Sequence, residues 1–387
     1  MFWNNKRTYL DFAAGVSANP SSPHEEGRMA RIALEDARTN IARLVEVHSN
    51  DVIFTSGATE ANALAILGVV RSRRKAVGSN KLHALYLPSA HASIVENMKL
   101  LANEGVDVEE LPIKNYRVDT ETLAKMLRQE TALVSMDAVC GETGVVWNTR
   151  AVAEVLRGKV RLSEQLGESD FPTARPLLHI DASQAPFTEK ITMAHFNADM
   201  LTLDASKVCD ARGIGVLIAR NTTQLEPLYR GGGQERGLRP GSEVADLAER
   251  FSSALSASVL ARDGFRAYAE TARKELIEII TEKIPNVYIN ESNNQAPNIL
   301  NISLLGRDTD YLAAILNEDG FAVSTRSACE TDSEEGSRAV LVLTDDLERA
   351  KATLRISWGP HVKSRELYRF SKALILAVSF VDNERER

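Results

Sequence analysis

Residues 176–184 read PLLHIDASQ, and residues 199–215 read DMLTLDASKVCDARGIG. Each stretch contains a short apolar run that favours a buried strand, and each run ends in polar residues. Asp181 ends the first run, and Lys207 follows the second. Because ligands bind beyond the carboxyl ends of parallel strands, a carboxylate and an amine at the ends of neighbouring strands would face one crevice.

This pairing suits the cofactor pyridoxal 5'-phosphate (PLP). A lysine amine can condense with the cofactor aldehyde, and an aspartate can keep the pyridine nitrogen protonated so that the ring withdraws electrons. The same residues also fit a simpler interpretation, a surface lysine beside a strand-end aspartate, because both residue types are mostly exposed. The rest of the chain has to distinguish the two.

The composition is that of an average soluble globular protein, with 387 residues, 44% hydrophobic and 26% charged. The formal net charge of −7 gives no general reason to bind nucleic acid or an acidic membrane. Cys140, Cys209 and Cys329 are odd in number and widely spaced, which argues against a disulfide framework or a zinc cluster and favours the reducing cytoplasm. The chain has no 18-residue apolar run, so we expect no signal peptide and no membrane span.

Strands alternate with helices over most of the chain. Apolar runs predict strands, and helical periodicity predicts helices, at these residues: strands 51–54, 82–87, 106–112 and 132–139; helices 25–47, 61–70, 120–128 and 149–166. Such alternation predicts an α/β domain with a mostly parallel, doubly wound sheet.

A long helical region, 243–284, leads into a second part of the chain. There, residues 298–304 and 321–324 favour strands, and residues 309–317 favour a helix. We therefore expect three parts: residues 1–15, packing with the small domain; residues 16–250, a large PLP-binding domain; and residues 251–387, a small domain carrying Cys329.

Two more strand ends carry candidate ligand residues. Residues 55–62, TSGATEAN, open a helix, whose N–H groups and dipole suit a phosphate. Gly57 allows close approach and Thr59 adds a hydroxyl, although an ordinary helix capped by Ser56 or Thr59 explains the same residues. His91 also lies where a strand gives way to a helix, where its ring can stack on a planar cofactor or simply cap the helix.

The small domain supplies two candidates. Residues 324–338, STRSACETDSEEGSR, form a polar loop with Cys329, an unusual place for a free cysteine, although an incidental surface thiol gives the same pattern. Arg355 lies on a predicted strand with apolar neighbours. A partly buried guanidinium needs an anion, either a ligand carboxylate or a structural ion pair.

Together these stretches resemble the cysteine desulfurases of the class V aminotransferase group, which are PLP enzymes of fold type I. The matching stretches, in chain order, are YLDFAA, NPSSPH, FTSGATEAN, the histidine of SAHASIVEN, HIDASQ, SK, RGIG, GGGQERGLRPGS, RSAC and LRISWG. The resemblance covers nearly the whole chain and implies a large domain with a mostly parallel doubly wound sheet and a smaller α+β domain.

The resemblance implies how the cofactor would be held. Lys207 would form the Schiff base, and Asp181 would partner the pyridine nitrogen. His91 would stack on the ring and move protons, and Gln184 would hydrogen-bond the phenolic oxygen. The residues implied to lie at the phosphate are Gly57, Ala58, Thr59, Ser206 and, from the neighbouring subunit of a homodimer, Ser242.

The resemblance also implies the substrate and the reaction. L-Cysteine would be bound through its carboxylate by Arg355, with Asn19 helping to position it. Cys329 would take the sulfur as a persulfide, alanine would leave, and the persulfide would pass to an acceptor protein. No direct contact with nucleic acid or membrane is implied, and no metal.

Three departures from the family pattern lie at the cofactor. Asp204 and Ser206 stand where the family has serine and histidine on the phosphate, and an aspartate would repel a dianionic phosphate. Residues 140–142, Cys-Gly-Glu, replace Asn-Asn-Glu, and residues 210–212, Asp-Ala-Arg, replace Gly-Pro-Lys. Each hydrogen bond lost to a charged group costs about 1.5–3 kcal/mol, so weak PLP binding or altered chemistry is an alternative.

Three functions follow. The first is a PLP-dependent cysteine desulfurase that supplies persulfide sulfur from Cys329 for iron–sulfur clusters, thiolated tRNA or another thio-product. The second is a related class V PLP enzyme, such as a selenocysteine lyase, a sulfinate desulfinase or an aminotransferase. The third is a non-catalytic dimeric scaffold, suggested by the departures at Asp204, Ser206 and Gly141.

Overall fold

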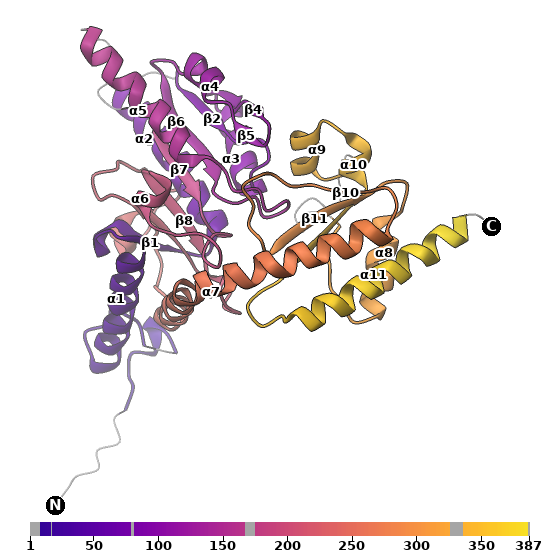
Figure 1. The fold of residues 1–387 in the computed structure, drawn as a ribbon. Coiled ribbons are helices and arrows are strands. Elements are labelled where there is room, and N and C mark those ends of the chain that lie inside the picture. The colour runs from indigo at the N-terminus through magenta and orange to yellow at the C-terminus, as the bar shows by residue number, and fades with distance from the viewer. Residues whose placement is uncertain (1–7, 17, 79–80, 167–174, 326–335, 386–387) are drawn as a thin grey trace, which may run out of the picture.

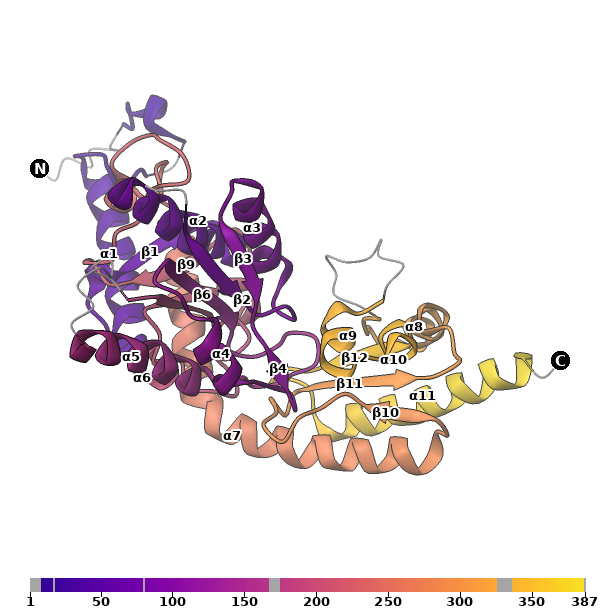
Figure 2. The same ribbon diagram turned by 90° about the horizontal axis from the view of Figure 1, so that it is seen from above.

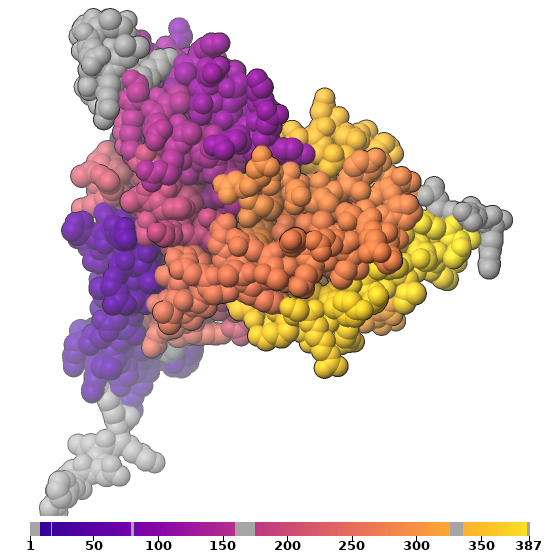
Figure 3. All heavy atoms as spheres, in the orientation of Figure 1, coloured from indigo at the N-terminus to yellow at the C-terminus, as the bar shows by residue number. Residues whose placement is uncertain are grey.

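The computed structural model describes residues 8–16, 18–78, 81–166, 175–325 and 336–385. They form a large unit and a small unit joined by the long helix α7, Ala245–Lys283 (Figure 1). In the space-filling view the small unit lies directly against the large one (Figure 3). An α/β fold with a large and a smaller unit is therefore confirmed.

The large unit is built on a seven-stranded sheet in the order β1-β9-β8-β7-β6-β2-β3. Its strands are β1 Val52–Thr55, β2 His83–Tyr86, β3 Asp107–Glu110, β6 Thr131–Asp137, β7 Leu177–Asp181, β8 Met200–Asp204 and β9 Gly215–Ala219. Strand β9 is antiparallel to both neighbours, and the other neighbouring pairs are parallel. The exception follows from the short connection 205–214, because a parallel return needs a longer crossover.

Helices cover both faces of this sheet. Figure 2 shows α2 and α3 on one side and α5 and α6 on the other. The α-helices of the large unit before α7 are α1 Glu25–Val45, α2 Ala58–Val77, α3 Ala92–Asn103, α4 Thr120–Met126, α5 Thr149–Leu166 and α6 Met193–Phe196. The strands β4 Ile113–Lys114 and β5 Arg117–Val118 form a separate hairpin. Residues 64–70 of α2 are buried on every side, as expected of a helix within a core.

The small unit has a three-stranded antiparallel sheet, β10 Val287–Ile289, β11 Ile299–Leu304 and β12 Thr353–Ser357, in that order. Its helices are α8 Thr309–Glu318, α9 Arg338–Thr344, α10 Leu347–Lys351 and α11 Ser364–Arg385. The predicted strand 321–324 is wrong in extent, since Ser324 alone forms a bridge, to Arg355.

Helix α7 belongs to both apolar cores. Phe251 and Leu255 pack into the core of the large unit, whereas Phe265 and Leu276 pack into that of the small unit. The helix is therefore the structural connection between the units, and the domain limits at 15 and 250 stay predictions.

The first described residues lie against the start of α1. The Asp11 carboxylate accepts a hydrogen bond from Ser22 Oγ at 2.7 Å and lies 3.1 Å from His24 Nε2. Packing of residues 1–15 on the small unit stays a prediction. Among the described residues, no helix has the length and apolar character needed to span a bilayer.

Candidate active site

The carboxyl ends of four strands, β1, β6, β7 and β8, lie at one edge of the large sheet. Asp137, Asp181 and Asp204 each end one of these strands, and Lys207 follows β8 in the short 3-10 helix η3, Ala205–Lys207. The predicted grouping of Asp181 with Lys207 at one edge therefore agrees with the sheet topology.

Asp181 is fixed by a hydrogen-bond network that reaches His91. The carboxylate is 6% exposed and accepts from Asn62 Nδ2 at 2.7 Å and from the Ser183 N–H at 2.9 Å. Asn62 Nδ2 also donates to Ser93 Oγ at 2.8 Å, and that oxygen lies 2.8 Å from His91 Nδ1. The predicted pyridine partner and the predicted ring-stacking histidine are thus held relative to each other.

His91 is exposed and caps helix α3. Its Nδ1 accepts the Ser93 N–H at 3.2 Å. A neutral ring that accepts at Nδ1 carries its proton on Nε2. Capping therefore fixes the tautomer of His91 and leaves its exposed ring able to donate from Nε2.

Asp204 is the last residue of β8, and its carboxylate reaches the turn before α2, where the sequence predicts a phosphate site. Its Oδ2 accepts the Ala58 N–H at 2.8 Å, and its Oδ1 accepts the Ser206 N–H at 2.8 Å. Oδ2 is also 3.3 Å from where a Cβ on Gly57 would lie. A backbone N–H that the cofactor phosphate would use is therefore already bonded to a carboxylate.

The rest of this turn is built for close packing. Gly57 is the N-cap of α2, with a φ of 146° that favours glycine, and it has no side chain to cap the helix, so the Ala58 N–H is bonded by Asp204 instead. The interpretation in which Ser56 or Thr59 caps the helix is therefore wrong. A Cβ on Gly215 would lie 2.8 Å from Gly57 Cα, so β9 needs glycine beside the turn.

Lys207 and Gln184 are the other two residues predicted to contact the ring. The Lys207 side chain is exposed, one residue beyond Ser206, which is also exposed. Gln184 is partly buried, and its Nε2 is 2.9 Å from where a Cβ on Gly141 would lie. The glycine at 141 removes one amide from the family pattern, and the Gln184 amide lies where that side chain would begin.

Neither described cysteine has the character of a nucleophile. Cys140 is buried, and burial together with the charge of Asp137 raises the pKa of its thiol to about 12. Cys209 is partly buried, and its Sγ donates to the Ala205 carbonyl at 3.4 Å. Cys329, the predicted nucleophile, lies outside the described residues, as does Arg326.

Arg355 reaches from the small unit to this edge. Its Nη1 donates to the Gly141 carbonyl at 3.2 Å and its Nη2 to Ser324 Oγ at 3.1 Å. The Arg355 N–H also donates to the Ser324 carbonyl at 2.6 Å. Ser324 and Thr325 are the last described residues before Cys329. Ser324 therefore places the start of the segment that contains Cys329 beside Arg355, the predicted carboxylate ligand.

Some positioning residues were missed by the sequence reasoning. Arg338 of α9 donates to the carbonyls of Pro88 and Ala90, just before His91, and so links α9 to the large unit. Asn62 lies in the matched stretch FTSGATEAN and could have been found there, because a helix residue of that stretch faces the strand ends. Nothing in the sequence indicates the partners of Arg338.

Asn19 and Ser242 lie apart from this network in their described contacts. Asn19 Nδ2 donates to the Ala14 carbonyl at 3.3 Å, and its Oδ1 accepts the Ser21 N–H at 2.9 Å. Ser242 is exposed in the glycine-rich loop. Exposure is what a residue that serves a neighbouring subunit needs, and both assignments stay predictions.

The glycine-rich loop that carries Ser242 is anchored rather than a simple linker. Glu235 is buried and accepts from Arg38 Nη1 and Nη2 at 2.8 and 2.7 Å. It also accepts the N–H of Phe54 in β1 at 2.8 Å. A paired and fully bonded carboxylate of this kind fixes the loop to the strand that leads into the Gly57 turn.

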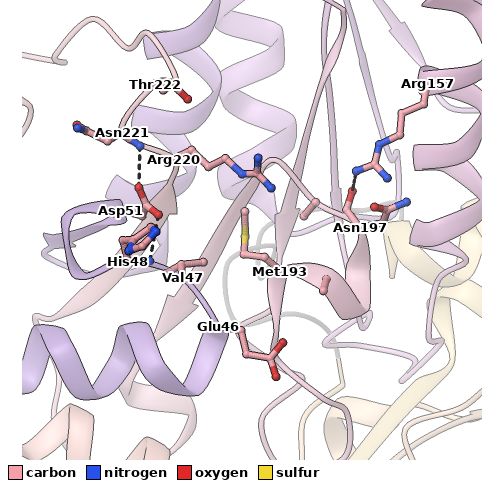
Figure 4. Close-up of a pocket in the computed structure, with 12 residues that line it drawn as sticks. Glu46, Val47, His48, Asp51, Arg157, Met193, Asn197, Arg220, Asn221 and Thr222 are labelled. Carbon is pink, nitrogen blue, oxygen red and sulfur yellow. Dashed lines mark hydrogen bonds between the residues drawn. The ribbon is translucent and has the colours of Figure 1, made fainter. Parts of the chain in front are cut away.

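A separate cavity of about 900 Å³ lies at the opposite edge of the sheet (Figure 4). Its lining includes Asp51 before β1, Asn197 before β8 and Arg220 after β9. The predicted site residues do not line it. Within the described parts of the chain, no group of three or more His, Cys, Asp or Glu side chains could hold a metal ion.

The residues fit one half of PLP and not the other. Asp181, Gln184, His91 and Lys207 have the side-chain chemistry predicted for contact with the ring, and Asn62 and Ser93 connect Asp181 to His91. At the phosphate half, the Ala58 N–H is bonded to a negative group, so a phosphate does not fit without displacing Asp204.

Comparison with known proteins shows the family of the chain. Residues 7–370 match the family model Aminotransferase class-V. The chain is 32% identical to "Cysteine desulfurase, mitosomal" of Encephalitozoon cuniculi over 364 residues, 92% of this chain and 79% of the relative.

Two solved structures are also similar. A NifS-like protein has a TM-score of 0.82 at 24% identity, covering 94% of this chain and 92% of its own, which supports the fold. The structure titled "SspA in complex with cysteine" has a TM-score of 0.72 at 26% identity, covering 89% and 91%. The chain therefore belongs to the cysteine desulfurase family of the class V aminotransferases, enzymes of fold type I that depend on PLP.

Proposed function

We propose that this chain converts L-cysteine to L-alanine and places the substrate sulfur on Cys329 as a persulfide. The observation that carries the proposal is the contact between Arg355 and Ser324. Arg355 is the candidate ligand of the substrate carboxylate, and Ser324 lies five residues before Cys329 in the sequence. The cysteine in the similar SspA structure supports the same substrate.

Arg355 would bind the substrate carboxylate. Both described partners of its guanidinium, the Gly141 carbonyl and the Ser324 hydroxyl, are neutral groups. A planar guanidinium pairs best with a carboxylate, which it can hold through two parallel hydrogen bonds. This contact would orient the substrate between the two units, with its sulfur towards the small unit.

Proton transfer would fall to Lys207 and His91. When bound, PLP supplies an electron sink for the negative charge that develops on the substrate carbons. The Lys207 amine would remove the proton from Cα. His91 would offer the proton on Nε2, because Ser93 holds its Nδ1 as an acceptor.

The sulfur would then move to the thiolate of Cys329. An S–S bond forms between Cys329 and the substrate sulfur as the Cβ–S bond breaks. The electron pair of that bond stays on Cβ, which takes a proton and gives alanine. A free thiol has a pKa of about 8.5, so a cation such as Arg326, which is close to Cys329 in sequence, would increase its thiolate fraction if the two side chains meet.

A homodimer would complete the site, with Ser242 reaching the phosphate of the partner. The start of the chain supports an interface, because Leu10, Phe12 and Val16 and the α1 residues Met29 and Ile32 are exposed apolar side chains. A dimer interface over these elements would remove such side chains from water. The chain would act in the cytoplasm, where the persulfide would pass to an acceptor protein for iron–sulfur cluster assembly or tRNA thiolation.

The test is to incubate the chain and PLP with L-cysteine and a thiol reductant, and to quantify alanine, sulfide and keto acid. Equal amounts of alanine and sulfide support the proposal. Keto acid in place of alanine would identify an aminotransferase, and alanine from a selenocysteine or sulfinate substrate alone would identify a lyase or a desulfinase.

A further inference from the structure

We propose that Asp204 is an internal competitor for the phosphate of PLP, so that the phosphate binds only when this carboxylate leaves the N-terminus of α2. The inference rests on the proposed PLP chemistry and concerns which form of the cofactor the site prefers. Three features carry it: the contacts of Asp204, the charges around the turn, and the exposure of the side chain.

The first feature is the position of the carboxylate. Asp204 Oδ2 bonds the Ala58 N–H at 2.8 Å and packs against Gly57. The N–H groups at the start of a helix carry its positive dipole end and are the groups that bind phosphates. Asp204 therefore already makes the contact that a phosphate would make.

The second feature is a second carboxylate in the same turn. Glu60 Oε2 accepts the Ser56 N–H at 2.5 Å, and the other carboxylate oxygen accepts the Tyr229 hydroxyl at 2.7 Å. Arg239 Nε lies 3.4 Å from Glu60, so this charge has a cationic partner. The described hydrogen bonds of Asp204, by contrast, come only from the neutral N–H groups of Ala58 and Ser206. A phosphate dianion at Ala58 would thus face an uncompensated charge on Asp204.

The third feature is that Asp204 can leave. The side chain is partly exposed at the end of β8. Rotation about its χ1 would release the Ala58 N–H into the site without a change in the backbone of β8. The exposed hydroxyl of Thr59 lies one residue further along and would join the released N–H.

A preference among cofactor forms follows. Pyridoxal has the same ring and aldehyde as PLP but no phosphate. It can therefore contact Asp181, Gln184 and Lys207 while Asp204 keeps its hydrogen bonds from the Ala58 and Ser206 N–H groups. PLP has to displace the carboxylate and then remain near it. Removal of the charge should therefore tighten the binding of PLP and leave that of pyridoxal unchanged.

The experiment is a titration of the 387-residue chain, dialysed free of cofactor, with PLP and separately with pyridoxal. Binding is followed by the visible absorbance of the bound ring. Asp204→Asn keeps the side-chain shape and one acceptor oxygen, and Asp204→Ser removes the carboxylate altogether. Asp263→Asn is the matched control, because Asp263 of α7 is 83% exposed and pairs with Arg262, outside the stretches predicted to contact the cofactor.

Both Asp204 variants should bind PLP at least about tenfold more tightly than the unsubstituted chain, because a repulsion between close charges is removed. Their affinity for pyridoxal should change by less than about twofold, because pyridoxal brings no phosphate beside residue 204. Both affinities of Asp263→Asn should also change by less than about twofold, because this variant keeps Asp204. Unchanged or weaker PLP binding by both Asp204 variants would overturn the inference while leaving the proposed function intact. Failure of every variant to bind PLP would overturn both.

Discussion

Asp137 and Asp181 lie opposite each other at the carboxyl ends of the neighbouring parallel strands β6 and β7. Burial, together with the charge of Asp181, raises the pKa of Asp137 to about 8. Asp137 is therefore a neutral acid near pH 7, whereas Asp181 accepts hydrogen bonds from Asn62 and Ser183. Protonation of Asp137 thus removes a second negative charge from beside the residue predicted to face the pyridine nitrogen.

Asp137→Asn should stabilise the fold at high pH. An aspartate has a pKa of about 3.9 in the unfolded chain, whereas the pKa of Asp137 in the folded chain is about 8. The contribution of Asp137 to the free energy of unfolding is therefore fully present below about pH 3.9 and is lost as the pH rises through about 8. The variant should therefore gain free energy of unfolding over the wild type at pH 9 compared with pH 4, on the order of 5 kcal/mol for a shift of about four pKa units. Urea unfolding at both pH values measures this difference, and a constant difference would contradict it.

Lys207→Ala should abolish the covalent link between the chain and PLP, and with it the visible absorbance band of that link. Borohydride reduction followed by peptide mapping should place the pyridoxyl group on Lys207 in the wild type. Lys190→Ala, at another exposed lysine, is the control and should retain the label. A label on a different peptide of the wild type would show that another lysine holds the cofactor.

Cys329→Ser should keep the absorbance of bound PLP and lose alanine and sulfide formation by about 100-fold or more, because an alcohol is a far poorer nucleophile than a thiolate. Cys140→Ser is the control, since the pKa of about 12 keeps the Cys140 thiol protonated. Turnover with L-cysteine compares the two variants. A fully active Cys329→Ser beside a dead Cys140→Ser would mean that the sulfur takes a different route.

The chain should form a dimer of twice its 42.5 kDa mass by light scattering. Ile32→Asp places a charge within the exposed apolar surface of α1 and should give monomers that bind PLP more weakly, because Ser242 of the partner is then lost. Leu260→Asp, on the 90% exposed Leu260 of α7, is the control. A monomeric wild type with normal PLP binding would be incompatible with the shared site.

Long periodic segments were predictable from the sequence, and short irregular ones were not. The helix at 149–166 has its predicted bounds because its apolar periodicity is sustained. The apolar residues Phe321 and Val323 suggested a strand, but both pack on the core of the small unit, and the Phe321 ring lies 5.6 Å from that of Phe370. Their alternation reflects burial without a hydrogen-bonded neighbour strand.

The site was predictable in its parts but not in their contacts. The rule that ligands lie beyond strand ends predicted Asp181 and Lys207 together. The bond from Ala58 to Asp204 spans 146 residues and depends on β9 lying between β1 and β8, an order that the sequence does not reveal. Sequence reasoning therefore identified a charge conflict at Asp204 without showing that the carboxylate fills the turn.

Helix α7 has 39 residues and is about 58 Å long at 1.5 Å per residue. One half of the helix packs into the core of the large unit and the other half into the core of the small unit. Loss of either core would therefore unfold part of α7 and weaken its packing in the remaining core. The two units should therefore melt as a single cooperative unit in calorimetry, and proteolysis between residues 250 and 265 should require global unfolding rather than local fraying.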